Sequence, residues 1–172
     1  MPTIYKHEMS AYKVEIESLN HVNLSEENNL THASLAISNR ANLIVVGLCG
    51  LVEAYLFQLS ENCESPFKLE DIRGQGISRL KTFLSRTKVV VFSELKFWQS
   101  FNSAYKIRNE IVHSYGGMVL EEASNELNKA LAELKIQGCL VASRRIRLSS
   151  KELGVIFNTV DNLLNELGAY AT

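Results

Sequence analysis

Residues 33 to 59 read ASLAISNRANLIVVGLCGLVEAYLFQL, and this stretch decides the fold. Its apolar residues recur at spacings of three and four, which predicts one helix from about Asn29 to Glu61. The second half is apolar on almost every side, a pattern typical of the central helix of a bundle rather than of a surface helix. Gly47 and Gly50 are small residues that would let another helix approach closely.

Amphipathic patterns on both sides predict further helices over residues 3–22, 69–86, 94–115, 120–135 and 150–168. The chain holds only two prolines and nine glycines, which suits helices because proline breaks a helix interior and glycine weakens it. Residues 88–92 (KVVVF) would form a short strand or a buried loop, and residues 136–149 a β-hairpin or a protruding arm. We therefore predict a single all-α domain over residues 1–172: a bundle of five to six helices with a short β excursion near 136–149.

The composition is that of an ordinary globular protein, with 46% hydrophobic and 22% charged residues. A formal net charge of -1 excludes a strongly basic, electrostatically driven nucleic-acid binder, but not a local basic site. The three cysteines show no CxxC spacing, so neither a disulfide framework nor a zinc site is indicated. The longest apolar run has ten residues, whereas a membrane span needs about 20. Without an apolar leader segment either, the chain reads as cytoplasmic, with no membrane partner, metal or cofactor.

The predicted helix over 94–115 carries one unusual residue. Ser93 is a good N-cap for it, and the glycine pair 116–117 should end it. Its apolar stripe would contain the residues Phe97, Phe101, Ala104, Arg108, Ile111 and Tyr115. The arginine in that stripe needs a carboxylate partner or a wet cleft, because an unpaired buried charge costs several kcal/mol.

Two further polar residues lie beside this arginine. His113 follows Arg108 by five positions, which places it roughly 140° around an ideal helix, and Asn109 shares the face of His113. One helix alone would not bring Arg108 and His113 together. Two copies packed across a twofold axis would place two arginines and two histidines in one cleft.

Metal-independent RNA cleavage has a use for these residue types. It needs a base for the 2′-hydroxyl, an acid for the departing 5′-oxygen, and positive charge beside the phosphorane. Histidine suits the first two roles because its ordinary pKa lies near neutrality. Arginine suits the third because it stays protonated and meets phosphate oxygens with a fork of donors. The alternative is chance, since Arg-x4-His arises in many helices and a surface histidine is usually only solvated.

The hexapeptide RNEIVH (108–113) resembles the R-x4-6-H motif of HEPN-domain proteins (higher eukaryotes and prokaryotes nucleotide-binding), including the frequent asparagine after the arginine. Its setting is similar too, near the end of a long helix before a glycine turn. The helix over residues 33–59 resembles the family's long apolar helix with one acidic residue, here Glu53, the only carboxylate between Glu27 and Glu61. The similarity spans roughly residues 30–116, and it implies a HEPN-like bundle.

The resemblance implies that Arg108 and His113 are the catalytic pair of a metal-independent endoribonuclease that works as a homodimer. Asn109 would position the pair or the phosphate, and Glu53 would orient Arg108 or His113 from the neighbouring helix. The alternative for Glu53 is a carboxylate that only packs between helices. Many such domains belong to toxin–antitoxin, abortive-infection or antiviral systems, so an RNA substrate and an antitoxin or other regulatory protein are the further partners implied. Others have lost catalysis and act as dimerisation or binding modules for RNA, a nucleotide or a protein.

Three arginines follow in the segment SRRIRLS: Arg144, Arg145 and Arg147. They would supply phosphate contacts to single-stranded RNA, or else form a solvated strand edge whose charge prevents aggregation. Residues 73–76 (RGQG) lack the pattern of a phosphate-binding loop. Trp98 is expected to pack at a helix or subunit contact rather than to stack on a base.

Overall fold

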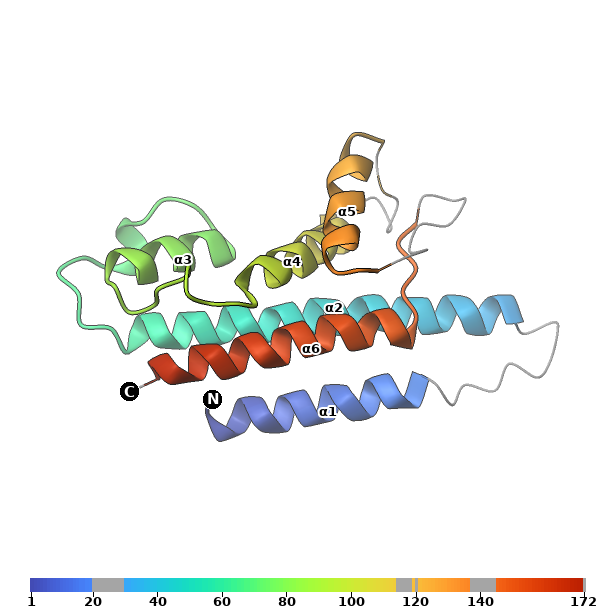
Figure 1. The fold of residues 1–172 in the computed structure, drawn as a ribbon, viewed down its shortest axis with the longest axis horizontal. Coiled ribbons are helices and arrows are strands. Elements are labelled where there is room, and N and C mark those ends of the chain that lie inside the picture. Colours follow the sequence, from blue (N-terminus) through green and yellow to red (C-terminus); the bar gives the residue numbers. More distant parts are fainter. Residues whose placement is uncertain (20–29, 114–118, 120, 137–144, 172) are drawn as a thin grey trace.

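The computed structural model of the chain describes residues 1–19, 30–113, 119, 121–136 and 145–171, which contain six α-helices (Figure 1). They are α1 (Thr3–Leu19), α2 (Leu30–Glu61), α3 (Gly76–Arg86), α4 (Trp98–His113), α5 (Glu121–Glu133) and α6 (Ser150–Leu167). Two single-turn 3₁₀ helices, η1 (Leu69–Asp71) and η2 (Gly168–Tyr170), complete them. The prediction of an all-α bundle is confirmed.

The predicted β excursion lies largely outside the described residues, because 137–144 are not among them. No strand occurs in the described part of the chain, where Arg145 and Ile146 form only isolated bridge contacts. The hairpin therefore stays a prediction. Residues 88–92 form a loop and not a strand; Val90 and Phe92 lie in the core, whereas Lys88 and Val91 are exposed.

Helix α2 is the centre of the bundle. Figure 1 shows α2 and α6 side by side, with α1 along one side of this pair and α3, α4 and α5 on the other. The longest helix therefore contacts four others: α1, α3, α4 and α6. This arrangement confirms the prediction that the stretch from 33 to 59 forms a central helix.

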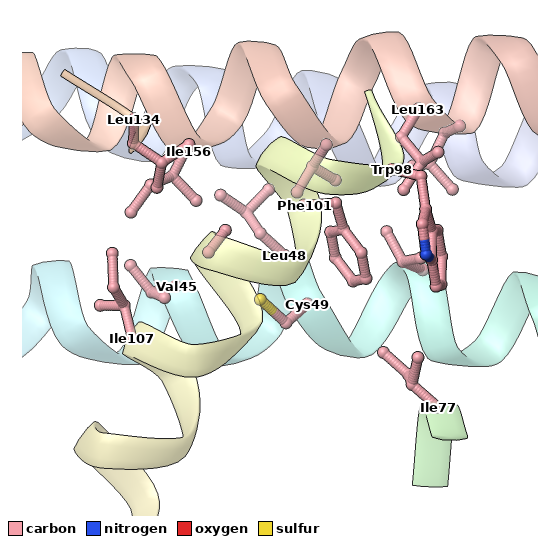
Figure 2. Close-up of a cluster of buried hydrophobic side chains, with 14 of the residues drawn as sticks. Val45, Leu48, Cys49, Ile77, Trp98, Phe101, Ile107, Leu134, Ile156 and Leu163 are labelled. Atoms are coloured by element: carbon pink, nitrogen blue, oxygen red, sulfur yellow. The ribbon is translucent and has the colours of Figure 1, made fainter. Parts of the chain in front are cut away.

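The core forms where α2, α4 and α6 meet. Figure 2 shows Leu48 of α2, Phe101 and Ile107 of α4, and Ile156 and Leu163 of α6 pointing into one cluster. All five side chains are fully buried. Phe101 and Ile107 are six residues apart and Ile156 and Leu163 seven, so each helix turns apolar residues to the same centre.

One side of α2 stays open to solvent, although its second half is apolar on almost every side. Leu43 is 71% exposed and Phe57 46% exposed. Gly47 does permit a close approach, because a Cβ there would lie 2.7 Å from Cζ of Tyr12 in α1. The same expectation for Gly50 is wrong, since no atom lies within 4 Å of the position that its Cβ would take.

Residues His32–Glu61 form the one described helix that is long and apolar enough to cross a bilayer, with a mean hydropathy of 1.8 in its most apolar window. Half of that window is buried inside the bundle, and the core helix of a soluble protein passes the same test. The cytoplasmic location stays a prediction.

Helix α4 begins four residues later than predicted. Ser93 is not its N-cap, because residues 91–97 form turns in which the Glu94 amide donates to the Val91 carbonyl at 3.0 Å. The carboxylate of Glu166, at the end of α6, instead accepts hydrogen bonds from the backbone amides of Lys96 and Phe97, both at 3.2 Å. The tertiary contact to α6 therefore fixes where α4 starts.

Candidate functional site

Arg108 lies at the edge of the buried face of α4 and not within that face. The buried residues of this helix are Trp98, Phe101, Ser103, Ala104 and Ile107. Arg108 follows Ile107 directly, so the helix rotates its side chain about 100° away from the core, and it is half-buried. Phe101 and Ala104 of the predicted stripe are buried, but at the next turn the helix faces the core through Ile107 and not through Arg108.

The guanidinium of Arg108 is held by its own helix. Its Nη1 donates to Oδ1 of Asn109 at 3.0 Å, and its Cζ lies 5.5 Å from the ring centroid of Tyr105. This stacking is a cation–π contact, typically worth about 0.5–1 kcal/mol at exposed sites. Among the residues that the structure describes, no carboxylate forms an ion pair with Arg108. The guanidinium is thus oriented but keeps free donors.

Glu53 of α2 meets Tyr105 of α4 at the first residue of α3. A Cβ on Gly76 would lie 3.2 Å from Oε1 of Glu53 and 3.3 Å from the hydroxyl oxygen of Tyr105. Gly76 has a φ of +54°, a conformation that favours glycine. Glu53 thus occupies the neighbouring helix as predicted, but no ion pair joins it to Arg108. Glu53 and Arg108 both lie close to Tyr105.

The pKa of Tyr105 reflects its closeness to Glu53 and to Arg108. Burial raises the pKa of Tyr105, and the carboxylate of Glu53 raises it further. The guanidinium of Arg108 and a backbone hydrogen bond from Ile77 act in the opposite direction on this pKa. The sequence reading missed Tyr105, although it precedes Arg108 by three residues and so shares its helix face.

Cys49 lies beneath these groups, on the turn of α2 before Glu53, within the buried cluster of Figure 2. Burial raises the pKa of its thiol to about 12, against a smaller lowering by Arg108. The thiol is therefore protonated at neutral pH and is no nucleophile.

His113 is the last described residue of α4, and its side chain is exposed. It follows Arg108 by roughly 7.5 Å along the helix axis and points in another direction. The chain thus brings Arg108, Asn109, Tyr105 and Glu53 together, but not His113 and Arg108. A cleft that contains both needs more than one copy of α4.

The arginine-rich segment lies elsewhere. Arg145 is exposed, whereas Nη1 of Arg147 donates to Oγ of Ser38 at 3.3 Å and so ties the segment to α2. Ser38 precedes Cys49 by eleven residues, roughly 16 Å along the helix. Arg144 lies outside the described residues. These arginines therefore do not join the cluster around Arg108.

Trp98 packs in the core, as expected, with its ring centroid 4.5 Å from that of Phe92 and 5.6 Å from that of Phe101. In the part of the chain that the structure describes, no three His, Cys, Asp or Glu side chains gather as metal ligands. Comparison of the chain with protein-family models, with curated proteins and with solved structures found no match. The geometry around Arg108 and the motif that contains it are therefore the basis for a proposal on function.

Proposed function

We propose that the chain is the protomer of a metal-independent endoribonuclease of HEPN type, in which Arg108 and His113 act on RNA. The observation that carries this proposal is that the guanidinium of Arg108 is held in place without a carboxylate partner among the described residues. Asn109 and Tyr105 orient its guanidinium, yet no described carboxylate neutralises it. A half-buried guanidinium with free donors suits a phosphate, which it can grip through two parallel hydrogen bonds.

The reaction assigns one role to each group. A neutral His113 removes the proton of the ribose 2′-hydroxyl, whose oxygen attacks the adjacent phosphorus. Arg108 stabilises the charge on the equatorial oxygens of the phosphorane. A protonated His113 gives its proton to the 5′-oxygen as the P–O5′ bond breaks. The products are a 2′,3′-cyclic phosphate and a 5′-hydroxyl end.

Two histidines in one site require a homodimer. The separation of Arg108 and His113 on α4 supports this requirement, because one chain offers each residue once and on different faces. Exposed apolar side chains support it too, since Val112, next to His113 on α4, is 44% exposed and Leu43 of α2 is 71% exposed. A second copy seated against these helices would bury both.

The proposal extends to the setting that the motif suggests. We place the protein in the cytoplasm as a toxin or phage-defence nuclease, held in check by an antitoxin or another regulatory protein. The competing hypothesis is a catalytically inactive module that dimerises or binds RNA, a nucleotide or a protein partner. The near-neutral net charge of -1 favours that hypothesis, since general affinity for RNA would be modest.

The test is cleavage of RNA in excess EDTA by the purified protein and by Arg108→Ala and His113→Ala. Both variants should lose cleavage, whereas the matched controls Arg86→Ala and His7→Ala, exposed on α3 and α1, should retain it. The products should carry 2′,3′-cyclic phosphate ends.

A mixing experiment then tests the shared site. Dimers formed between wild-type and His113→Ala chains hold only one intact histidine, so an excess of the His113→Ala chain should suppress cleavage by the wild type. Cleavage that survives His113→Ala would refute the assignment of the histidine. A wild-type protein that cleaves none of several RNAs would favour the binding module.

A further inference from the structure

A groove of about 520 Å³ opens beside the proposed active site, between α2 and α3. Glu53 and Phe57 line one wall, and Leu69, Gly76 and Arg79 line the other. The walls are mainly apolar, so the carboxylate of Glu53 is the main hydrogen-bond acceptor in the groove. The Nε of Arg79 is already committed, because it donates to the carbonyl of Leu69 at 3.0 Å.

Glu53 is half-buried and accepts no hydrogen bond from any residue that the structure describes. A carboxylate that loses water without gaining a partner is unfavourable, since its oxygens forgo hydrogen bonds that solvent would give. An ionised carboxylate is an acceptor only. A ligand that satisfies Glu53 therefore has to present N–H or O–H donors, and two parallel donors would satisfy both oxygens.

Phe57 supplies a second element of recognition. It follows Glu53 by one helical turn on the same side of α2, and its ring is 46% exposed. An exposed phenyl face beside a carboxylate suits a flat group with polar edges, and nucleic-acid bases stack on such rings.

The groove lies near Arg108, because Tyr105 is close to both. Phe57 lies one turn beyond Glu53, about 6 Å along α2. Tyr105 connects the two places, because it contacts the guanidinium of Arg108 and meets Glu53 at Gly76. A nucleotide with its phosphate on Arg108 would thus reach the groove with its base.

We propose that this groove is a base-recognition subsite that selects guanine, an inference that rests on the proposed function. Guanine alone among the four bases presents two adjacent donors, N1–H and the 2-amino group, which match the two oxygens of Glu53. Adenine and cytosine place a ring acceptor next to their amino group, and uracil flanks its single N–H with carbonyls. These acceptors would face the carboxylate. Phe57 stacks on the base, and Glu53 sets its identity.

The test measures binding to the full chain by calorimetry with guanosine 3′,5′-bisphosphate, a probe with phosphates on both sides of the ribose and no bond to cleave. The inosine analogue lacks the 2-amino group and should bind about tenfold more weakly, the expected effect of losing one hydrogen bond to a charged group. The adenosine analogue should bind more weakly still.

Variants separate the two elements. Glu53→Gln should remove the preference for guanine over inosine, whereas Phe57→Leu should weaken all three probes about tenfold and leave the preference intact. The matched control Glu8→Gln, exposed on α1 at the opposite side of the bundle, should behave as wild type. Thermal melting of each variant shows whether it folds.

Equal binding of the three probes by the wild type would overturn the inference, as would a guanine preference that survives Glu53→Gln. The base-recognition proposal and the ribonuclease proposal can be refuted separately. RNA cleavage without base preference would refute the subsite and leave the ribonuclease standing. Selective guanosine binding without any cleavage would refute the ribonuclease and support a guanine-binding groove.

Discussion

The contact between Glu166 and the start of α4 offers a test of how the fold holds the candidate site. The two carboxylate oxygens are used separately, because the Lys96 amide donates to Oε1 and the Phe97 amide to Oε2. Glutamine has the same shape but only one acceptor oxygen. In Glu166→Gln one of the two amides therefore loses its acceptor and faces an NH₂ group instead.

The magnitude follows from this loss. Removing an N-cap acceptor costs about 0.5–2 kcal/mol, and bonds to a charged acceptor lie at the upper end. A carboxylate at the C-terminal end of α6 is itself unfavourable by about 0.3–1 kcal/mol, and its removal returns part of the cost. We predict that Glu166→Gln lowers the free energy of unfolding by about 1–2 kcal/mol, and that Glu166→Ala lowers it by about 2–3 kcal/mol.

Urea denaturation followed by circular dichroism measures this difference, and the melting temperature of Glu166→Gln should fall by about 3–6 °C. The matched control is Glu94→Gln, an exposed carboxylate in the same turns before α4. If Glu166→Gln is as stable as this control, the carboxylate is not what fixes the start of α4, and the reasoning is wrong.

Two more predictions concern backbone and burial. Gly154 in α6 has open space at its Cβ position, so Gly154→Ala should raise the free energy of unfolding by about 0.5–1 kcal/mol. Gly76 has a φ of +54°, and a Cβ there would lie 3.2 Å from Oε1 of Glu53. Gly76→Ala should therefore lower the free energy of unfolding by about 1–2 kcal/mol. Urea unfolding of both variants checks the opposite signs, and equal effects would contradict the described turn at Gly76. The Cys49 thiol has a pKa of about 12 in the folded protein, against an ordinary value of 9.0 in the unfolded chain. Between pH 9 and pH 12 the unfolded state therefore binds fewer protons than the folded state. The free energy of unfolding should fall as the pH rises through this range. The reduced wild type should therefore lose about 1.4 kcal/mol more than Cys49→Ala between pH 8 and pH 10, and parallel losses would show that the thiol is not buried.

Local patterns predicted most of the fold. The limits of α2 came out within one residue, because its apolar spacing is strong and uninterrupted. The start of α6 is also as predicted, and a local capping box marks it, in which the Ser149 amide donates to Oε2 of Glu152 at 2.7 Å. The start of α4 was wrong because its acceptor, Glu166, lies 70 residues further along the chain.

The site was predicted in part. Arg108 and Asn109 do interact, as consecutive residues of one helix. The contact of Tyr105 with Arg108, and the meeting of Tyr105 and Glu53 at Gly76, depend on how α2, α3 and α4 pack, which no spacing along the chain encodes. For the same reason, the position of His113 relative to a second chain cannot be predicted from spacing along one sequence.

The pairing of α2 with α6 also has a kinetic consequence. These helices lie side by side, although residues 62–149 separate them in sequence, and α6 contributes seven buried residues to the shared core. Helices form in microseconds, but bringing α2 and α6 together closes a long loop. The entropy lost in closing that loop is offset only after the contacts between the two helices form. During synthesis, the most apolar helix therefore emerges early and waits with one face uncovered until α6 follows. In that interval the nascent chain is most exposed to aggregation and to capture by chaperones.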